Sequence, residues 1–154
     1  MGIDYIDYEQ TPKIYNKTVE KSGGGMAGVR DEGGILLMLE NVQNDWYYPE
    51  IADKAAYMMF SLCRGHYFVD CNKRISVTLT MYFLLQNGYL FVAQTFMKDM
   101  EEIALDLAAG CMDKDLLIEI MHCLVNDEEY SESVLLGIAN ARAKRYEIEQ
   151  QFEE

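Results

Sequence analysis

The sequence has 154 residues, half of them apolar and a quarter charged, which is typical of a globular chain long enough to bury a core. Its formal net charge of −13 argues against a nucleic-acid-binding surface, because phosphate contacts need broad positive potential. No apolar run approaches the ~18 residues of a membrane span, and the N-terminus lacks an export-signal pattern. The four cysteines show no C-x-x-C spacing, which favours reduced thiols. We therefore expect a single-domain protein of the cytoplasm.

Apolar periodicity predicts helices along most of the chain, so the expected fold class is all-α. The first helix should begin with Thr11 as its N-cap and Pro12 in its first turn. Its buried side is predicted to consist of Ile14, Thr18 and Val19. The glycine run at 23–25 ends this helix. That run has neither the lysine and serine of a phosphate-binding P-loop nor a preceding strand, so we expect a flexible connector.

A second helix is predicted up to Val42, with Ile35, Leu36, Leu39 and Val42 on its buried side. The following segment, residues 44–48, breaks the pattern and displays Trp46, Tyr47 and Tyr48 together. Such aromatic clusters usually pack in the core or at its rim. The alternative is a flap beside a functional site that docks a partner.

Two strongly apolar helices follow, predicted over residues 49–64 and 72–88. The first should end at Gly65. Its buried side is predicted to consist of Ile51, Ala55, Met58, Met59 and Leu62. The second is apolar nearly all round, which predicts the buried central helix of the fold.

The C-terminal third is predicted to contain a short extended piece at 89–93, helices at about 96–109 and 113–125, and a last helix from Ser131. We interpret residues from about 130 to 154 as an appended segment. Its first half is expected either to dock on the body or to mediate self-association through Val134, Leu135 and Ile138. The charged tail from about Arg142 is expected to project into solvent.

The chemistry of the chain is concentrated between Arg64 and Arg74, the stretch that joins the two apolar helices. It combines an imidazole, a carboxylate, an amide and three cations, namely His66, Asp70, Asn72, Arg64, Lys73 and Arg74. The stretch ends at a helix start, where free backbone N–H groups and the positive end of the helix dipole favour an anion. Cations in the first turn are unfavourable for a bare helix. They are explained if a multiply charged anion, such as a nucleotide polyphosphate, lies among them.

Two other interpretations of this stretch remain open. Cations stabilise a thiolate, so Cys71 is an alternative nucleophile. A zinc site is a second alternative, with His66, Cys71, His122 and Cys123 as its ligands. Adjacent side chains on a helix diverge, which disfavours His122 and Cys123 as a pair, so a structural role is expected for His122.

The pattern His66-x-Phe68-x-Asp70-x-Asn72-Lys73-Arg74 resembles the signature of the Fic/Doc superfamily, and specifically its Doc (death on curing) branch. The similarity covers roughly residues 11–125, and its further elements are Gly23-Gly24, Gly28-Val29-Arg30-Asp31 with the following helix, Arg64-Gly65, and Asn87-Gly88. Cys71 departs from it, since a small alanine or glycine is expected there. The resemblance implies a Fic/Doc-type helical bundle with the motif at a loop–helix junction and a buried central helix after the loop.

The resemblance also implies a reaction, the transfer of a phosphate-containing group from ATP, with Mg²⁺, to a Ser/Thr hydroxyl of a protein. Fic members with glycine at the position of Lys73 usually transfer AMP, whereas Doc, with lysine there, is a kinase that acts on elongation factor Tu. We therefore expect a Doc-like toxin. A Fic-type AMP-transferase and a catalytically silent binding module are the alternatives.

Residue roles follow from the resemblance. His66 would be the general base that takes the proton of the acceptor hydroxyl. Asp70 would hold Mg²⁺, cap the next helix, or do both. Asn72 would donate to a phosphate oxygen or cap the helix, and Phe68 would anchor the loop in the core. Lys73 and Arg74 would act in catalysis by neutralising charge on the phosphates, and the full nucleotide-binding set is Arg64, Asn72, Lys73 and Arg74.

The expected partners are a protein substrate and an antitoxin. Many Fic proteins carry an inhibitory helix whose glutamate pairs with the motif arginine. The segment 131–136 is the nearest candidate here, and it lacks a glutamate at the required place. We therefore expect inhibition by a separate antitoxin, with Arg74 and the neighbouring groove as its footprint, and neither nucleic acid nor a membrane as a partner.

Overall fold

The computed structural model describes residues 2–23 and 28–153. This part of the chain forms seven helices: α1 (Gln10–Lys21), α2 (Glu32–Asn41), α3 (Ile51–Arg64), α4 (Asn72–Gln86), α5 (Leu90–Ala108), α6 (Lys114–Val125) and α7 (Glu132–Glu153). Its one β-type pairing is an antiparallel bridge between Val29 and Phe68. The predicted all-α fold is confirmed. The predicted connector at 23–25 lies mostly outside the described residues, and no described helix is long and apolar enough to cross a bilayer.

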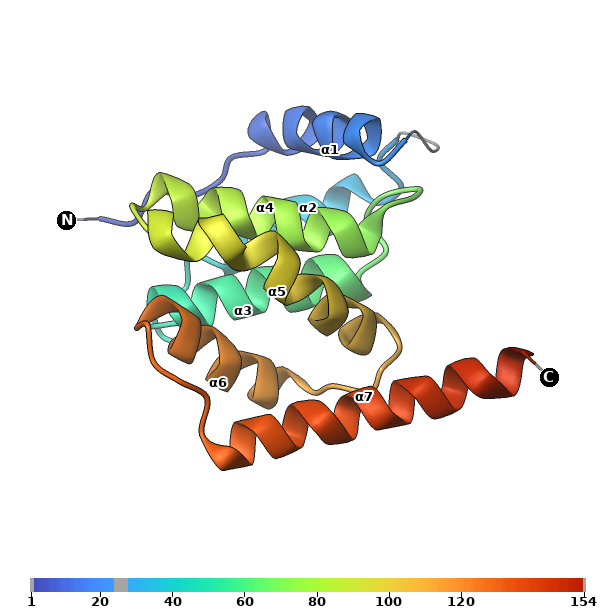
Figure 1. Cartoon of the computed structure of the whole chain (residues 1–154). Helices are drawn as coiled ribbons and strands as arrows, with labels where there is room; N and C mark the ends of the chain where they lie inside the picture. The colour runs from blue at the N-terminus through green and yellow to red at the C-terminus, as the bar shows by residue number, and fades with distance from the viewer. Residues whose placement is uncertain (1, 24–27, 154) are drawn as a thin grey trace.

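The centre of the bundle is formed by α3 and α4 (Figure 1). Helix α3 packs against α4, α5 and α6, and α4 packs against α1, α3 and α5. The buried apolar residues of α4 are Ile75, Val77, Leu79, Phe83 and Leu84, which confirms a buried central helix after the motif. Helix α3 is buried on more sides than its predicted stripe, since Ala52, Ala56, Tyr57 and Cys63 are also inside, whereas Ile51 of that stripe is only partly buried. These two helices place both ends of the motif on rigid elements.

The N-terminal helix starts two residues earlier than predicted, because its N-cap position is Glu9 and not Thr11. The side chains of Asp7 and Gln10 each bond the other's backbone N–H, at 2.8 and 3.0 Å, and the helix begins at Gln10. Thr11 therefore lies inside α1 and is not its N-cap. Its hydroxyl donates to the carbonyl of Asp7 instead. The predicted buried side of α1 is confirmed.

Helix α2 follows its predicted pattern with one exchange. Leu36 is 47% exposed, and Met38, at 1%, takes its place in the core. The next turn carries the aromatic cluster. Trp46 and Tyr47 are 88% and 71% exposed, whereas Tyr48 packs on Tyr57 with ring centroids 4.4 Å apart. The prediction of core or rim packing is thus wrong for Trp46 and Tyr47.

This aromatic turn is not a flap beside the motif. It precedes the start of α3, and the motif follows the end of that helix. The 14 residues of α3 separate the two by about 21 Å.

The predicted extended piece at 89–93 is wrong, because α5 begins at Leu90. Val92 continues the buried stripe of α5, four residues before Phe96 and eight before Met100. The turn at Asn87-Gly88 is short enough for α5 to fold straight back on α4.

The tail of α7 does not leave the body at Arg142 as predicted. Val134 and Ala141 are buried, and Arg145 is only 4% exposed. Arg145 Nε donates to Asp106 Oδ1 at 2.7 Å, and Arg142 Nη2 donates to Asp106 Oδ2 at 3.0 Å. Asp106 is fully buried on α5. The first half of α7 therefore docks through Val134, as one prediction had it, and a buried ion-pair cluster extends the docking.

Candidate active site

The motif forms a loop, residues 65–71, between the end of α3 and the start of α4. His66 and Cys71 both have left-handed backbone conformations, with φ of 52° and 62°. This conformation costs a non-glycine residue about 1–2 kcal/mol, and it persists only where the surroundings fix it. The contacts of the loop show what fixes it.

Asn72 holds the loop from inside. Its Oδ1 accepts from the N–H of Phe68 at 3.1 Å, and its Nδ2 donates to the carbonyl of Phe68 at 3.0 Å. The N-cap position of α4 is Cys71, and no side chain caps that helix. The prediction that Asn72 or Asp70 caps the helix is therefore wrong. The contact predicted between Asn72 and a phosphate stays a prediction, since Nδ2 has a second N–H.

Phe68 anchors the loop as predicted, because it is fully buried. Its ring stacks on Tyr15 of α1, with centroids 4.2 Å apart. Beside it, the N–H of Val69 donates to Gly28 at 3.0 Å, and the N–H of Arg30 donates to Tyr67 at 2.8 Å. The segment before α2 thus runs along the loop and supports it.

Tyr67 is held between two glycines. A Cβ on Gly34 or on Gly65 would lie 2.7 or 2.5 Å from atoms of the Tyr67 ring. A Cβ on Gly65 would also lie 2.6 Å from the carbonyl oxygen of Ser61. At both positions only glycine leaves room for the Tyr67 ring. These close contacts fix the loop on this side as well.

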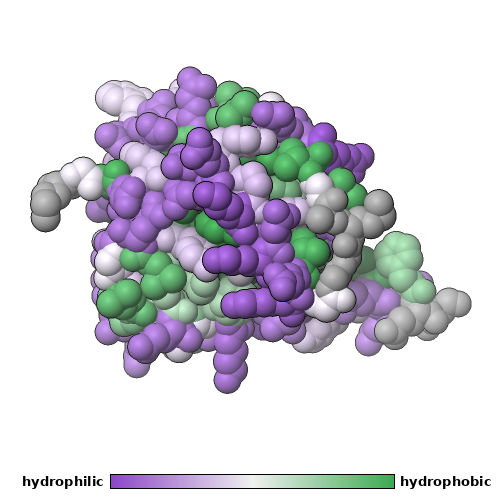
Figure 2. Space-filling model, turned by 90° about the horizontal axis from the view of Figure 1, so that it is seen from above, coloured by the Kyte–Doolittle hydropathy of each residue, from purple (hydrophilic) through white to green (hydrophobic). Residues whose placement is uncertain are grey.

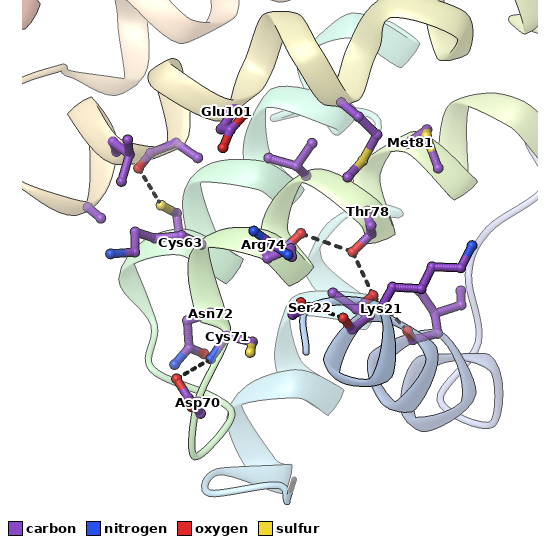
Figure 3. A pocket seen from close by; sticks show the side chains of 18 of the residues that line it. Lys21, Ser22, Cys63, Asp70, Cys71, Asn72, Arg74, Thr78, Met81 and Glu101 are labelled. Atoms are coloured by element: carbon purple, nitrogen blue, oxygen red, sulfur yellow. Dashed lines mark hydrogen bonds between the residues drawn. The ribbon is translucent and has the colours of Figure 1, made fainter. Parts of the chain in front are cut away.

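Next to this loop is a pocket of about 1060 Å³, at the upper end of the size range of small-molecule sites. It lies between α1, the motif and α5 (Figure 3). All the predicted site residues line it: Arg64, His66, Asp70, Asn72, Lys73 and Arg74. The structure therefore brings the predicted set together at one cavity.

The pocket concentrates positive charge on an acidic protein. Six of the 13 lysines and arginines of the chain line it: Lys17, Lys21, Arg64, Lys73, Arg74 and Lys98. The lining carboxylates are Asp70 and Glu101, and Glu101 hangs from α5 above Arg74 in Figure 3. Lys17, Lys21 and Lys98 were not predicted, because isolated lysines on amphipathic helices carry no signal of a shared cavity.

The surface seen from the α1 side is mainly hydrophilic, with scattered apolar patches (Figure 2).

The start of α4 lies at this charge cluster, and no side chain caps it. An uncapped helix N-terminus leaves its first N–H groups without intrahelical acceptors. Lys73 and Arg74 are exposed in that first turn. Thr78, one turn later, bonds the carbonyl of Arg74 at 2.9 Å and faces the hydroxyl of Thr18 at 3.0 Å, which ties α4 to α1. The arrangement suits a polyphosphate.

Asp70, which we predict to hold Mg²⁺, lies at the pocket. Its Oδ1 accepts from the N–H of Cys71 at 2.7 Å, and the residue is exposed at the pocket. Mg²⁺ in nucleotide sites usually takes one or two carboxylates, with phosphates and water completing the shell. A single carboxylate beside the cations of this pocket fits that donor set.

Arg64 is partly engaged elsewhere. Its Nη1 donates to the carbonyl of Leu107 on α5 at 3.3 Å, and its guanidinium lies 5.9 Å from the centre of the Phe60 ring. It lines the pocket from the end of α3. Its predicted phosphate contact stays a prediction.

The alternative zinc site is wrong. His122 lies on α6, where its ring nitrogens are 2.8 Å from Asp53 and 3.4 Å from Glu50, two residues at the start of α3. His66 follows the other end of α3, about 21 Å along the helix. The structural role predicted for His122 fits these contacts.

The sequence is similar to those of known proteins. The sequence model of the Fic/DOC family matches residues 5–84. The protein called "Protein kinase doc", from Escherichia phage P1, is 30% identical over 118 residues, which is 74% of this chain and 86% of the phage protein. The protein called "Toxin Doc", from Mycolicibacterium smegmatis, is 33% identical over 96 residues, or 60% of this chain and 74% of that protein. The chain belongs to the Fic/DOC family.

Proposed function

We propose that this protein is a Doc-like toxin that transfers the γ-phosphoryl group of ATP to a Ser/Thr hydroxyl of a target protein. The observation that carries the proposal is the convergence of His66, Asp70, Lys73 and Arg74 on one cationic pocket at an uncapped helix start. The names of the two relatives, a protein kinase and a toxin, support the same activity. A translation factor such as elongation factor Tu is the proposed target class.

The motif residues divide the tasks of this reaction among them. The first turn of α4, with Lys73 and Arg74, binds the phosphates and offsets the charge that develops on them. Mg²⁺, held by Asp70, would supply further neutralisation of phosphate charge. His66 accepts the proton of the hydroxyl as its oxygen bonds to the γ-phosphorus. The bond from that phosphorus to the β,γ-bridging oxygen breaks, and ADP leaves.

Lys73 favours phosphoryl transfer over adenylyl transfer. Glycine at this position would let phosphates approach the backbone of the first helical turn closely. The lysine side chain fills that space and adds a charge, so the nucleotide binds in a shifted or reversed pose. The phosphorus that faces His66 then decides which group is transferred.

The proposed partners are a protein substrate and an antitoxin in trans. The six cations of the pocket suit an acidic inhibitor, and Arg74 with the adjoining groove is its proposed footprint. A toxin that acts on translation works in the cytoplasm, which is the proposed location. The helix α7 is proposed to be an appended element of a single Fic/Doc domain.

Two labelled forms of ATP test the reaction. Purified elongation factor Tu, and separately a cell extract, are incubated with the protein, Mg²⁺ and ATP labelled at either the γ- or the α-phosphate. The proposal predicts that protein is labelled from the γ-phosphate only. Label from the α-phosphate would show an AMP-transferase instead. Absence of label from both, in the extract as well, would contradict an enzymatic function and favour a binding module.

A further inference from the structure

Tyr15 joins α1 to the motif loop, although it lies outside the motif and does not line the pocket. Its side chain is 1% exposed. The ring stacks on Phe68 with an angle of 17° between the planes, and the hydroxyl donates to the carbonyl of Asp70 at 3.2 Å. Burial is the largest cause of the raised pKa of Tyr15, so the phenol stays protonated and able to donate.

The hydrogen bond from the Tyr15 hydroxyl is made to the peptide group between Asp70 and Cys71. The carbonyl of this peptide accepts from Tyr15, and its N–H donates to the carboxylate of Asp70 at 2.7 Å. Both polar ends of the peptide are thus held by side chains. The orientation of this peptide sets the φ of Cys71, which is 62° and so lies in a region that non-glycine residues rarely adopt.

Rotation of this peptide would disturb the site. It would relieve the left-handed conformation of Cys71 and remove the N–H from the Asp70 carboxylate, which would then be free to swing. Because α4 begins at the next residue, the carboxylate would also lose its fixed place relative to Lys73 and Arg74. The Tyr15 hydroxyl opposes the rotation, since the carbonyl would lose its donor.

We propose that Tyr15 is a positioning residue whose hydroxyl fixes the orientation of the Asp70–Cys71 peptide. It thereby holds the Asp70 carboxylate beside the first turn of α4, which carries Lys73 and Arg74. Tyr15 acts through Asp70 and does not touch the substrate. Its effect on the reaction rests on the function proposed above, whereas the locking of the peptide does not.

The Tyr15→Phe variant tests the lock, because it removes the hydroxyl and keeps the stacked ring. One readout needs no activity: the rate at which iodoacetamide alkylates Cys71, followed by peptide mass spectrometry. Cys71 is half-buried in the locked loop, so the rate should rise several-fold in the variant. Cys63 is an internal reference that should stay slow, since burial raises its pKa to about 11. An unchanged rate at Cys71 would overturn the proposal, even if the protein proves to have no transferase activity.

The second readout is the Mg²⁺ concentration that gives half-maximal phosphoryl transfer. It should rise about tenfold in Tyr15→Phe, as for other groups that orient a metal ligand, with the KM for the target protein unchanged. A purely structural defect would lower the amount of active enzyme and leave the Mg²⁺ requirement as it was. That outcome would contradict a positioning role.

Tyr57→Phe is the matched control. Tyr57 is also buried and packs on another aromatic ring, that of Tyr48, and its hydroxyl accepts a hydrogen bond from Asn41 at 3.3 Å that does not involve the Asp70–Cys71 peptide. Neither readout should change in this variant. Equal changes in both tyrosine variants would show a general loss of stability and overturn the proposal.

Cys71→Gly tests the role of the left-handed backbone conformation at this position. Glycine adopts positive φ without steric cost, so the loop should need the lock less. The double variant Tyr15→Phe/Cys71→Gly should regain most of the Mg²⁺ affinity that Tyr15→Phe loses. A double variant as impaired as Tyr15→Phe would contradict the proposal.

Discussion

Replacing His66 by asparagine should reduce phosphoryl transfer by about 10²–10⁴-fold, which is the usual contribution of a general base. Asparagine tolerates the left-handed backbone conformation that His66 adopts, so the loop should keep its shape. The side chain is exposed at the pocket and has no catalytic task other than proton transfer in our account. Initial rates with γ-labelled ATP, together with the Kd for ATP, measure the effect. We expect the rate to fall while the Kd stays within about threefold, because the phosphates are bound by the start of α4.

The other histidine of the chain is the control. His122→Asn removes the contacts with Asp53 and Glu50 at the far end of α3 and leaves the pocket intact. It should cost some stability and leave the transfer rate unchanged. A transfer rate in His66→Asn close to that of the unaltered protein would exclude His66 as the base.

Replacing Asp106 by alanine should lower the free energy of unfolding by about 3 kcal/mol. The carboxylate accepts two charge-assisted hydrogen bonds, from Arg142 and Arg145, each worth ~1.5–3 kcal/mol. Burial acts to lower the pKa of Arg145, but its bonds to Asp106 and Glu149, together with the charges of Asp106 and Glu102, raise it. The guanidinium of Arg145 thus remains charged, and the loss of its partner Asp106 should lower the stability of the fold. For a domain of this size the Tm should fall by roughly 6–12 °C.

Calorimetry gives this Tm, and hydrogen exchange should show loss of protection along α7. Asp99→Ala, an exposed position on the same helix, is the control and should stay within about 0.5 kcal/mol. An unaltered Tm in Asp106→Ala would mean that apolar contacts such as that of Val134 alone hold α7 in place.

Periodic apolar residues allowed most of the helices to be predicted, because burial on one face is a local property of the sequence. The motif residues were also predictable as a set, since a loop of seven residues between two helices leaves them little room to separate. The start of α5 was missed, since residues 89–93 were predicted as an extended piece although Val92 continues the buried stripe of the helix.

Features that depend on distant parts of the chain could not be predicted. Lys54 is fully buried in α3, where its Nζ donates to Val42 and Asp45 at 3.0 and 2.7 Å, and no periodicity indicates a lysine there. The partnership of Asp106 with Arg145 spans 39 positions of the sequence. Tyr15 likewise meets the loop only once α1 has packed on α4. Pairing across elements, rather than local preference, places these side chains.

Calorimetric titration with the non-hydrolysable analogue β,γ-imido-ATP tests the central claim most directly, because it requires no protein target. In the presence of Mg²⁺ we expect binding at a single site. Arg74→Ala should weaken this binding about 10–100-fold, the worth of a charge-assisted hydrogen bond. Arg30→Ala should leave it unchanged, since Arg30 donates to the loop through its backbone N–H and is not among the residues that line the pocket. Absence of nucleotide binding, both with and without Mg²⁺, would contradict the account.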